Sequence, residues 1–481
     1  SSNGGTGTVG LNGAGNAVLV DINQIDGCII GTGSSISITT NSSSGDILVG
    51  TDTGGSLNST GILTLDSGRD VIFKGGVNTA VGTVDIDAVR DVIVADNADA
   101  TVSTAGDITI DAGDGVNVGN NAVGTILSSA GNIAVNAGGA SGTGTNDLDI
   151  GANVGSSGSR VEATAGNVIL ATTGDNSEVR VGLEGDGSVS AGGTVDISTA
   201  GIDSDIDIGD EAGKGSVTAG GNIVFDSSDG VSIGDDSTGT VVSIGGDISI
   251  TANNDVLVIA DESGSDGSFV RADNGSVSLF ANGPTTDVII GNIGNGSVQA
   301  SGQITVSTSG VNGDIELGED FGSGTITAGG DINLLANDGV KIGNLGVGTV
   351  TSTNGDINIV ATGASGTFFS DLSIGIFATA SGSSVNADNG SISLTAGSGF
   401  VDVGLFADAS VNAQNNIVIS AAQEVTLGIT SVGTVTANTG TIDVFTGSGF
   451  INMADNSSFV AEGDLSFDTP GTGFLDILMG T

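Results

Sequence analysis

Histidine, tryptophan and tyrosine are absent from the 481 residues, and the chain has one cysteine, Cys28, and two prolines. Without histidine, the common nucleophilic and metal-binding constellations lack their base and their imidazole ligand. One cysteine excludes an intrachain disulfide framework, and we interpret Cys28 as a small buried hydrophobe, with an intermolecular bridge or a reactive thiol as the alternative. Glycine is frequent, at 86 residues, but without a G-X-Y period, so collagen is excluded.

Positive charge is also scarce, since 8 Lys and Arg face 56 Asp and Glu, for a net charge of −48. Such a surface repels nucleic acid and anionic membranes and attracts cations. No apolar run approaches the roughly 18 residues that a membrane helix needs. We therefore expect no nucleic-acid partner and no membrane insertion.

A repeat fills the chain from end to end, and residues 220–244, GGNIVFDSSDGVSIGDDSTGTVVSI, contain one copy. Each copy holds three apolar pairs with one residue between the two members, which is the alternation of a β-strand. Gly, Asp and Ser clusters separate the pairs and predict turns. One copy cannot bury its own apolar face and must stack on its neighbours. In this copy the expected pairs are Ile223 with Phe225, Val231 with Ile233, and Val242 with Ile244.

The first strand of each copy follows Gly and a small polar residue, and its first apolar residue recurs about every 27 residues. Less regular matches at Val9, Ile36 and Leu63 extend the series to about 18 coils. The regular positions are Val84, Ile108, Ile133, Val168, Val195, Ile223, Ile248, Val277, Ile304, Ile332, Ile357, Ile392, Ile417, Ile442 and Leu465.

The second strand has the form [V/I/L]-x-[apolar]-G and the third the form [S/T]-V-x-A. Three short parallel strands per coil, stacked on the next coil, make a parallel β-helix. Parallel crossovers are nearly always right-handed. The sequence therefore predicts an all-β fold in which residues 1–481 form one continuous right-handed parallel β-helix.

An internal duplication is visible at an offset of 224 residues, because residues 106–168 align with residues 330–392. GASGTGTNDLDIG in the first copy matches GASGTFFSDLSIG in the second without gaps. Each match lies in an unusually long coil of 35 residues. We expect an extra excursion at the same lateral position in both coils.

The repeats GDITIDAGDGVNVG and GGNIVFDSSDGVSIG resemble those of the filamentous-haemagglutinin type of bacterial exoprotein and related β-strand-repeat adhesins. The resemblance covers almost the whole chain. It implies a right-handed β-helical shaft, export to the cell surface, and a role in adhesion or surface structure. The Asn-Pro motifs of that family's secretion domain are missing, so the resemblance implies a shaft.

Acidic residues recur just after the second strand, and this row is the candidate metal site. Adjacent coils would place like charges about 5 Å apart, which in water costs under about 1 kcal/mol per pair. A solvated acidic edge is therefore one interpretation, and Ca²⁺ bridging, which needs six to eight oxygens, is the other. No other cofactor is indicated. The candidate residues are Asp210, Asp235, Asp236, Asp261 and Glu319.

Two further polar patterns have structural explanations. Asp or Asn precedes the first strand in many coils, as at Asp107, Asn132 and Asn167, and such side chains can form hydrogen bonds along a stack. The outward positions of the third strand are mostly Ser, Thr or Asn, as at Thr325 and Thr327. That face is either plainly solvated or a neutral surface for lateral packing or glycans.

We expect no enzymatic activity and no catalytic residues. Acid pairs such as Asp235–Asp236 could in principle cleave glycosides. The grooves of β-helix enzymes that act on polysaccharides usually need basic residues or aromatic platforms, and here the eight basic residues are scattered singly. The expected function is an extracellular structural or adhesive shaft at the cell surface. Because an uncovered coil presents unpaired strand edges, we expect head-to-tail self-association into a fibre. The alternatives are a segment of a long secreted adhesin that binds glycans and, less favoured, a polysaccharide-processing enzyme.

Overall fold

The computed structural model describes residues 17–20, 28–30, 35–40, 45–50, 56–139, 147–363, 371–380, 382–447, 450–468 and 476–479. It divides into two compact units, here called unit 1 (residues 1–229 and 235–244) and unit 2 (residues 230–234 and 245–481). In the described parts, the helices are three single 3-10 turns, η1 (Val154–Ser156), η2 (Ser263–Ser265) and η3 (Ala378–Ala380). No described helix is long and apolar enough to cross a membrane.

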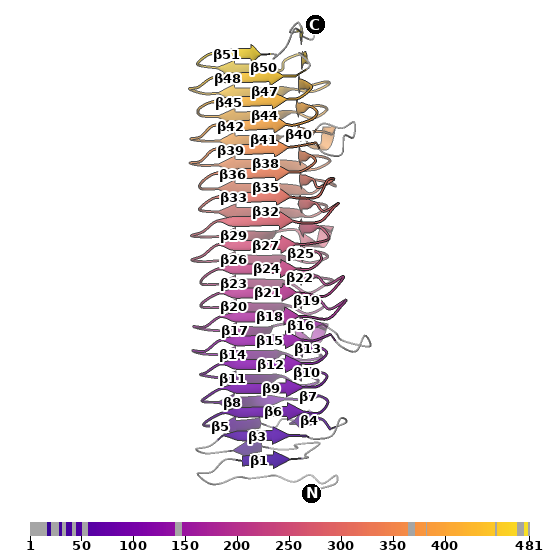
Figure 1. Ribbon diagram of the computed structural model, residues 1–481, viewed down its shortest axis with the longest axis vertical. Coiled ribbons are helices and arrows are strands. Elements are labelled where there is room, and N and C mark those ends of the chain that lie inside the picture. The colour runs from indigo at the N-terminus through magenta and orange to yellow at the C-terminus, as the bar shows by residue number, and fades with distance from the viewer. Residues whose placement is uncertain are drawn as a thin grey trace. The chain divides into compact units, whose positions relative to one another are not determined.

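Within each unit the chain runs through successive coils of three short strands (Figure 1). One coil of unit 1 consists of β9 (Val84–Ala88), β10 (Val92–Val94) and β11 (Ala100–Thr104). Its strands pair in parallel with β12 (Ile108–Ala112), β13 (Val116–Val118) and β14 (Gly124–Ser128) of the next coil. The coils therefore build three parallel sheets, called here the first, second and third sheet.

Unit 1 contributes strands to all three sheets. Its first-sheet strands are β1 (Ala17–Val20), β3 (Ile36–Thr39), β6 (Leu63–Ser67), β9, β12, β15 (Ile133–Ala137), β18 (Val168–Thr172), β21 (Val195–Thr199) and β24 (Ile223–Ser227). Its second-sheet strands are β4 (Ile47–Val49), β7 (Val71–Phe73), β10, β13, β16 (Leu148–Ile150), β19 (Val179–Val181) and β22 (Ile206–Ile208). Its third-sheet strands are β2 (Cys28–Ile30), β5 (Ser56–Ser59), β8 (Gly76–Ala80), β11, β14, β17 (Ser159–Ala163), β20 (Gly187–Ala191), β23 (Gly215–Ala219) and β26 (Gly239–Ser243).

Unit 2 repeats this arrangement. Its first-sheet strands are β27 (Ile248–Ala252), β30 (Val277–Ala281), β33 (Ile304–Thr308), β36 (Ile332–Ala336), β39 (Ile357–Ala361), β42 (Ile392–Ala396), β45 (Ile417–Ala421), β48 (Ile442–Thr446) and β51 (Leu465–Asp468). Its second-sheet strands are β25 (Val231–Ile233), β28 (Leu257–Ile259), β31 (Val288–Ile290), β34 (Ile315–Leu317), β37 (Val340–Ile342), β40 (Leu372–Ile374), β43 (Val401–Val403), β46 (Glu424–Leu427), β49 (Phe450–Met453) and β52 (Asp476–Met479). Its third-sheet strands are β29 (Ser268–Ala272), β32 (Asn295–Ala300), β35 (Ser323–Ala328), β38 (Val347–Ser352), β41 (Ser383–Ala387), β44 (Ala409–Ala413), β47 (Gly433–Ala437) and β50 (Ser458–Ala461).

The predicted fold class, an all-β parallel solenoid with three strands per coil, is confirmed. Every regular position of the predicted series, from Val84 to Leu465, is the first residue of a first-sheet strand. Ile36 and Leu63 also begin strands, whereas Val9 lies outside the described residues. The coil number and the right-handed sense stay predictions.

The core of each coil is filled by the apolar positions that the alternation predicts. In the coil of β12 to β14, Ile108, Ile110, Val116, Val118 and Ile126 are at most 1% exposed. Full burial of one such side chain stabilises the fold by about 1.5–3 kcal/mol, before the cost of ordering the chain.

The third strand buries one large side chain and one small one, and here one predicted pair was wrong. In β26 the buried residue is Val241, whereas Ile244 is 51% exposed. Val241 stacks on Val217 because Gly239 pairs with Gly215. A shift of one residue moves a side chain to the other face of a strand, so the expected pair, Val242 with Ile244, is on the outside.

A residue with positive φ follows the second strand of most coils, which explains the glycine of the second-strand motif. Gly209 follows β22 with φ +81°, and a Cβ there would lie 2.5 Å from the carbonyl oxygen of Thr238. Glycine reaches this left-handed region without a steric penalty. Ala95 and Ala260 adopt the same conformation at the corresponding place, with φ +73° and +64°.

The corner between the first and second strands varies most in length and, together with the 3-10 turns η1, η2 and η3 before the third strand, accounts for the irregular period. Longer corners are closed by a buried threonine: Thr199 Oγ1 donates to the Ser204 carbonyl oxygen (2.7 Å), and Thr308 Oγ1 donates to that of Gly313 (2.8 Å). In the two 35-residue coils most of the extra residues fall at this corner, between β15 and β16 and between β39 and β40, and the rest fall before the third strand, where η1 and η3 lie. The predicted excursions themselves, residues 140–146 and 364–370, lie outside the described residues.

Candidate functional site

Asp and Asn side chains at the corners bond each coil to the next. Before the first strand, Asp107 Oδ1 accepts from the backbone N–H of Asn132 (2.7 Å), and Asn132 Oδ1 accepts from that of Asn167 (2.9 Å). The structural interpretation of this row is confirmed.

The same bond recurs at the other two corners, where the sequence patterns had not been interpreted. Before the second strand, Asp287 Oδ1 accepts from Asp314 N, and Asp314 Oδ1 from Gly339 N, both at 2.7 Å. Before the third strand, Asp186 Oδ1 accepts from Lys214 N (3.0 Å). Part of the large negative charge therefore belongs to coil-to-coil hydrogen bonding.

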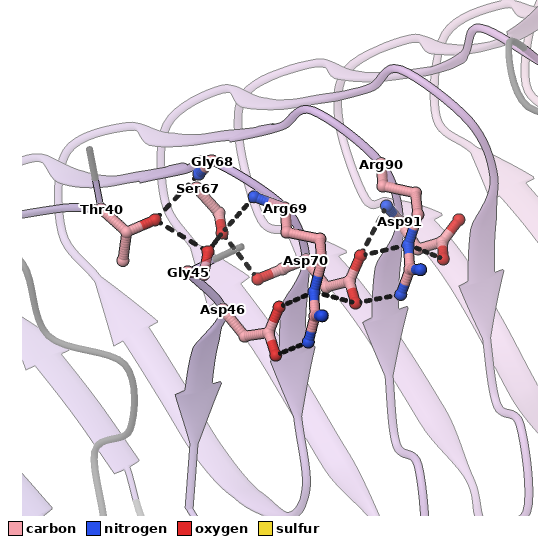
Figure 2. Close-up of polar contacts among 9 residues, drawn as sticks. All are labelled: Thr40, Gly45, Asp46, Ser67, Gly68, Arg69, Asp70, Arg90 and Asp91. Carbon is pink, nitrogen blue, oxygen red and sulfur yellow. Dashed lines mark hydrogen bonds and ion pairs between the residues drawn. The ribbon is translucent and has the colours of Figure 1, made fainter. Parts of the chain in front are cut away.

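Basic side chains of unit 1 also link coils, as Figure 2 shows for a chain of alternating charges before the second strand. Arg69 pairs with Asp46 of the preceding coil, with its Nε 2.5 Å from Asp46 Oδ1. One coil later, the Nε of Arg90 lies 2.7 Å from Asp70 Oδ1 and 3.0 Å from Asp91 Oδ2. Asp70 is 3% exposed. The expectation that basic residues are scattered singly was therefore wrong for this corner.

Hydroxyl groups beside this ion-pair chain make the same kind of connection (Figure 2). Thr40 Oγ1 donates to the Gly45 carbonyl oxygen at 2.9 Å and accepts from the backbone N–H of Gly68 in the next coil at 2.8 Å. Ser67 Oγ contacts that Gly45 oxygen at 2.9 Å. Each of these buried hydroxyls therefore ties together two coils.

A denser ion cluster, the Arg180 cluster, lies on the outer face of the second sheet in unit 1. The central residues of β16 and β19, Asp149 and Arg180, are in register. Arg180 Nε lies 2.7 Å from Asp149 Oδ1, its Nη1 lies 3.0 Å from Glu178 Oε2, and its Nη2 contacts Asp147. Arg180 is 18% exposed at its side chain, so one guanidinium bridges three carboxylates while largely shielded from water.

Asp207, in the coil that follows, is in register with Arg180 but makes no ion pair with it among the described contacts. Burial raises the pKa of Asp207 well above its ordinary value, and the nearby Asp210, Glu178 and Asp205 raise it further. The carboxylates around Arg180 thus outnumber the positive charge available to them.

Unit 2 has a corresponding Lys341 cluster. DLDIG (residues 147–151) in unit 1 corresponds to DIELG (residues 314–318) in unit 2. Lys341, central in β37, is in register with Glu316 of β34. Its Nζ lies 2.5 Å from Glu316 Oε1 and 2.7 Å from Asp314 Oδ2. Burial lowers the pKa of Lys341, but these two carboxylates more than offset that effect and hold it above its ordinary value.

One further carboxyl group, Glu319, adjoins the Lys341 cluster. Burial, together with the charge of Glu316 and a side-chain hydrogen bond to it, raises the pKa of Glu319 to about 8. Burial also raises the pKa of Asp287, one coil earlier, to about 6. In the coil before Arg180, the residue that corresponds to Glu319 is Ala152.

The predicted acidic edge is a row of turn residues. In unit 1, Asp210 N donates to the Gly182 carbonyl oxygen and Asp235 N to that of Gly209, while Asp236 is exposed. In unit 2, Asp261 Oδ1 accepts a hydrogen bond from Asn292 (2.5 Å), and Glu319 N donates to Gly291 O.

These acids do not converge on a common point. Over the described parts of the chain, no three Asp, Glu, Cys or His side chains form a group that could hold a metal ion. The Ca²⁺ edge stays a prediction. The residue that sequence reasoning missed is Glu316, an outward strand residue three positions before Glu319.

The outer face of the third sheet in unit 2 carries two rows of uncharged polar side chains. Thr325 and Thr327 of β35 are in register with Thr349 and Thr351 of β38. Farther along, Asn412 Nδ2 donates to Asn386 Oδ1 at 2.9 Å. In a chain of this net charge, such an uncharged face is a candidate surface for a neutral partner. The further members of the rows are Ser384, Ser410, Thr434 and Thr436.

No family model matches the chain, and neither the curated proteins nor the solved structures compared with it gave a match.

Proposed function

We propose that this protein is an extracellular structural shaft with an adhesive role and no catalytic turnover. The observation that carries the proposal is the use made of its polar side chains. Corner carboxylates and amides, buried hydroxyls, and arginines at two places bond one coil to the next, as at Asp107, Thr40 and Arg180. A chain whose polar groups are used in this way is suited to carrying load along a stack.

The adhesive part of the proposal rests on the neutral rows of the third sheet in unit 2. Glycan hydroxyls and a face of Ser, Thr and Asn side chains can exchange hydrogen bonds without a charge having to lose its water. Retention on immobilised neutral glycans tests this part. Replacing Thr349 and Thr351 together by lysine should abolish retention if this face is the one that binds, and unchanged retention would contradict it.

The fibre is the finer part of the proposal. A coil not covered by a neighbour offers unpaired strand edges to another chain, and a heterologous head-to-tail contact does not close on itself, so it grows into a filament. Native mass measurement with electron microscopy of concentrated protein tests it. Filaments are expected, and protein that stays monomeric at high concentration would contradict end-to-end assembly.

The competing function is a polysaccharide-processing enzyme. Glycosidases hold two carboxyl groups about 5–9.5 Å apart across the scissile bond, whereas Glu316 and Glu319 are close enough to share a hydrogen bond. Incubation with a panel of acidic and neutral glycans separates the two functions. The shaft proposal expects no product, and release of oligosaccharides would overturn it.

A further inference from the structure

Two buried oxygen atoms beside Glu319 have no hydrogen-bond donor. Among the described residues, Glu316 Oε2 and Asn292 Oδ1 are buried side-chain acceptors without a partner. Glu316 as a whole is 5% exposed, and its other oxygen faces Lys341. An unmet buried acceptor costs roughly 1–3 kcal/mol, so two such atoms at one place require a physical explanation.

Both acceptors are adjacent to the same residue. The Glu316 carboxylate is close enough to Glu319 for its charge to act on the Glu319 carboxyl group. Asn292 occupies the turn one coil before Glu319, since Glu319 N donates to the carbonyl oxygen of Gly291. Asn292 Nδ2 is turned back to Asp261 at 2.5 Å, which leaves Oδ1 for the coil that follows, where Glu319 lies.

Unit 1 shows how the same arrangement is completed with a donor. There, Asn120 Nδ2 is likewise turned back to an aspartate, Asp96 Oδ1, at 3.1 Å. Its Oδ1 accepts a hydrogen bond from Asn153 Nδ2 of the next coil at 3.0 Å. In unit 2 the place of Ala152 is taken by Glu319 and that of Asn153 by Asp320, so the next coil offers no amide hydrogen to Asn292 Oδ1.

A proton on Glu319 cannot satisfy both acceptors, because a carboxylic acid carries one O–H. A cation between the three side chains would meet both acceptors and both carboxylates together. A cation would displace any proton on Glu319. Asp314, Glu316 and the ionised Glu319 would then face one ammonium group, Lys341, which leaves two negative charges at the end of β34 for the cation to balance.

We propose that Glu316, Glu319 and Asn292 bind a hard divalent cation, with Ca²⁺ as the best fit, at the end of β34. Ca²⁺ takes six to eight oxygen ligands in flexible geometry and accepts carboxylates, amide carbonyls and water together. Glu319 is only partly buried and Asp320 beside it is exposed, so water can complete the coordination. Of the five residues predicted from the sequence, this site uses only Glu319.

The test is calorimetric titration of the full chain with Ca²⁺, comparing Glu319→Gln with Asp236→Asn. Each variant replaces one carboxyl group by an amide, but Asp236 is an exposed turn residue of unit 1. We expect one saturable site per chain, weakened at least about tenfold in Glu319→Gln and unchanged in Asp236→Asn. Equal weakening in both variants, or no saturable site in the unchanged protein, would show general attraction to an acidic surface and overturn the proposal.

Thermal unfolding in chelator supplies a second, independent reading. The amide introduced by Glu319→Gln can donate to Glu316 Oε2, so this variant should melt above the unchanged protein in chelator and gain nothing from Ca²⁺. Glu319→Ala, which reproduces the Ala152 of unit 1, should also lose the response to Ca²⁺ but without that gain. If the melting temperature of Glu319→Gln in chelator is equal to or lower than that of the unchanged protein, the role given to the two buried acceptors without a donor is contradicted.

Discussion

The Arg180 cluster of unit 1 and the Lys341 cluster of unit 2 are built on the same strand positions, yet they end in different electrostatic states. Arg180 reaches three carboxylates with its fork of donors, whereas Lys341 reaches two. Position 152 is alanine, and the corresponding position 319 is glutamate. Arg180 contacts each of its three carboxylate partners, whereas the Lys341 cluster keeps an acceptor, Glu316 Oε2, that no described side chain fills.

The difference shows what the repeat fixes and what it leaves free. The three-strand coil, the apolar core and the hydrogen bonds of corner Asp and Asn side chains recur in both units. The outward central residue of the second strand can change its charge without disturbing the core, because successive side chains of a strand point to opposite faces. Chemistry specific to one coil can therefore arise at this position while the stack is preserved.

The largest expected effect comes from removing the two cations. Arg180→Met leaves three shielded carboxylates without their partner and should destabilise the protein by about 3–5 kcal/mol. Lys341→Met breaks two ion pairs instead of three, so the free energy of unfolding should fall less, by about 2–3 kcal/mol. Urea unfolding measures both, and equal losses would break the comparison.

The next largest effect is expected from replacing the glycine in the turn of each cluster. Gly151 and Gly318 have φ +83° and +68°, and a Cβ would lie 2.3 Å from the Gly185 carbonyl oxygen and 2.6 Å from that of Val347, respectively. Gly151→Ala and Gly318→Ala should each cost about 2–3 kcal/mol in urea unfolding, because the strain of a left-handed residue adds to the clash. Only Gly318→Ala should also change Ca²⁺ binding, since it moves Glu319, and a matching change in Gly151→Ala would contradict the assignment.

A smaller effect is expected from Lys341→Arg, which gives the Lys341 cluster a guanidinium group like that of the Arg180 cluster. Lys341→Arg supplies additional N–H groups that can reach Glu316 Oε2, so in chelator it should gain about 1 kcal/mol. The same variant should respond less to Ca²⁺ in thermal unfolding. A loss of stability in chelator would mean that the missing donor is not what distinguishes the clusters.

An effect of similar size concerns pH. The pKa of Glu319 is raised to about 8 from an ordinary value of 4.5, so the folded state holds a proton that the unfolded state has lost between those values. In chelator, stability should therefore fall as the pH rises from about 4.5 to about 8 and stay level above that. We expect the melting temperature to fall by about 1–3 °C more than that of Glu319→Gln over this range. If the melting temperatures of the unchanged protein and of Glu319→Gln change in parallel with pH, the raised pKa of Glu319 is contradicted.

The fold was predictable from the sequence because strand alternation and turn chemistry repeat in every coil. Each first-sheet strand from β9 onward begins at the residue predicted, from Val84 to Leu465. The third strand was harder to place, since Val241 and Val242 are adjacent and only the pairing of Gly239 with Gly215 decides which is buried.

The polar clusters were largely missed because their members are one coil apart in the sequence. Arg69-Asp70 and Arg90-Asp91 recur after 21 residues, a signal that could have revealed the ion-pair chain of Figure 2. Glu316 was missed for a different reason. An isolated outward glutamate is normally solvated, and its burial depends on the side chains of the neighbouring coils, which a pattern within one coil does not contain.

The central claim is that polar side chains serve to join coils, and native-state hydrogen exchange tests it most directly. Amide protection is to be measured in the unchanged protein, in Arg180→Met and in Lys341→Met. The account predicts that Arg180→Met lowers protection in β16, β19 and β22, that Lys341→Met lowers it less in β34, β37 and β40, and that the rest of each unit keeps its protection. Unchanged protection in both variants would contradict it, because the clusters would then contribute nothing to the joining of coils.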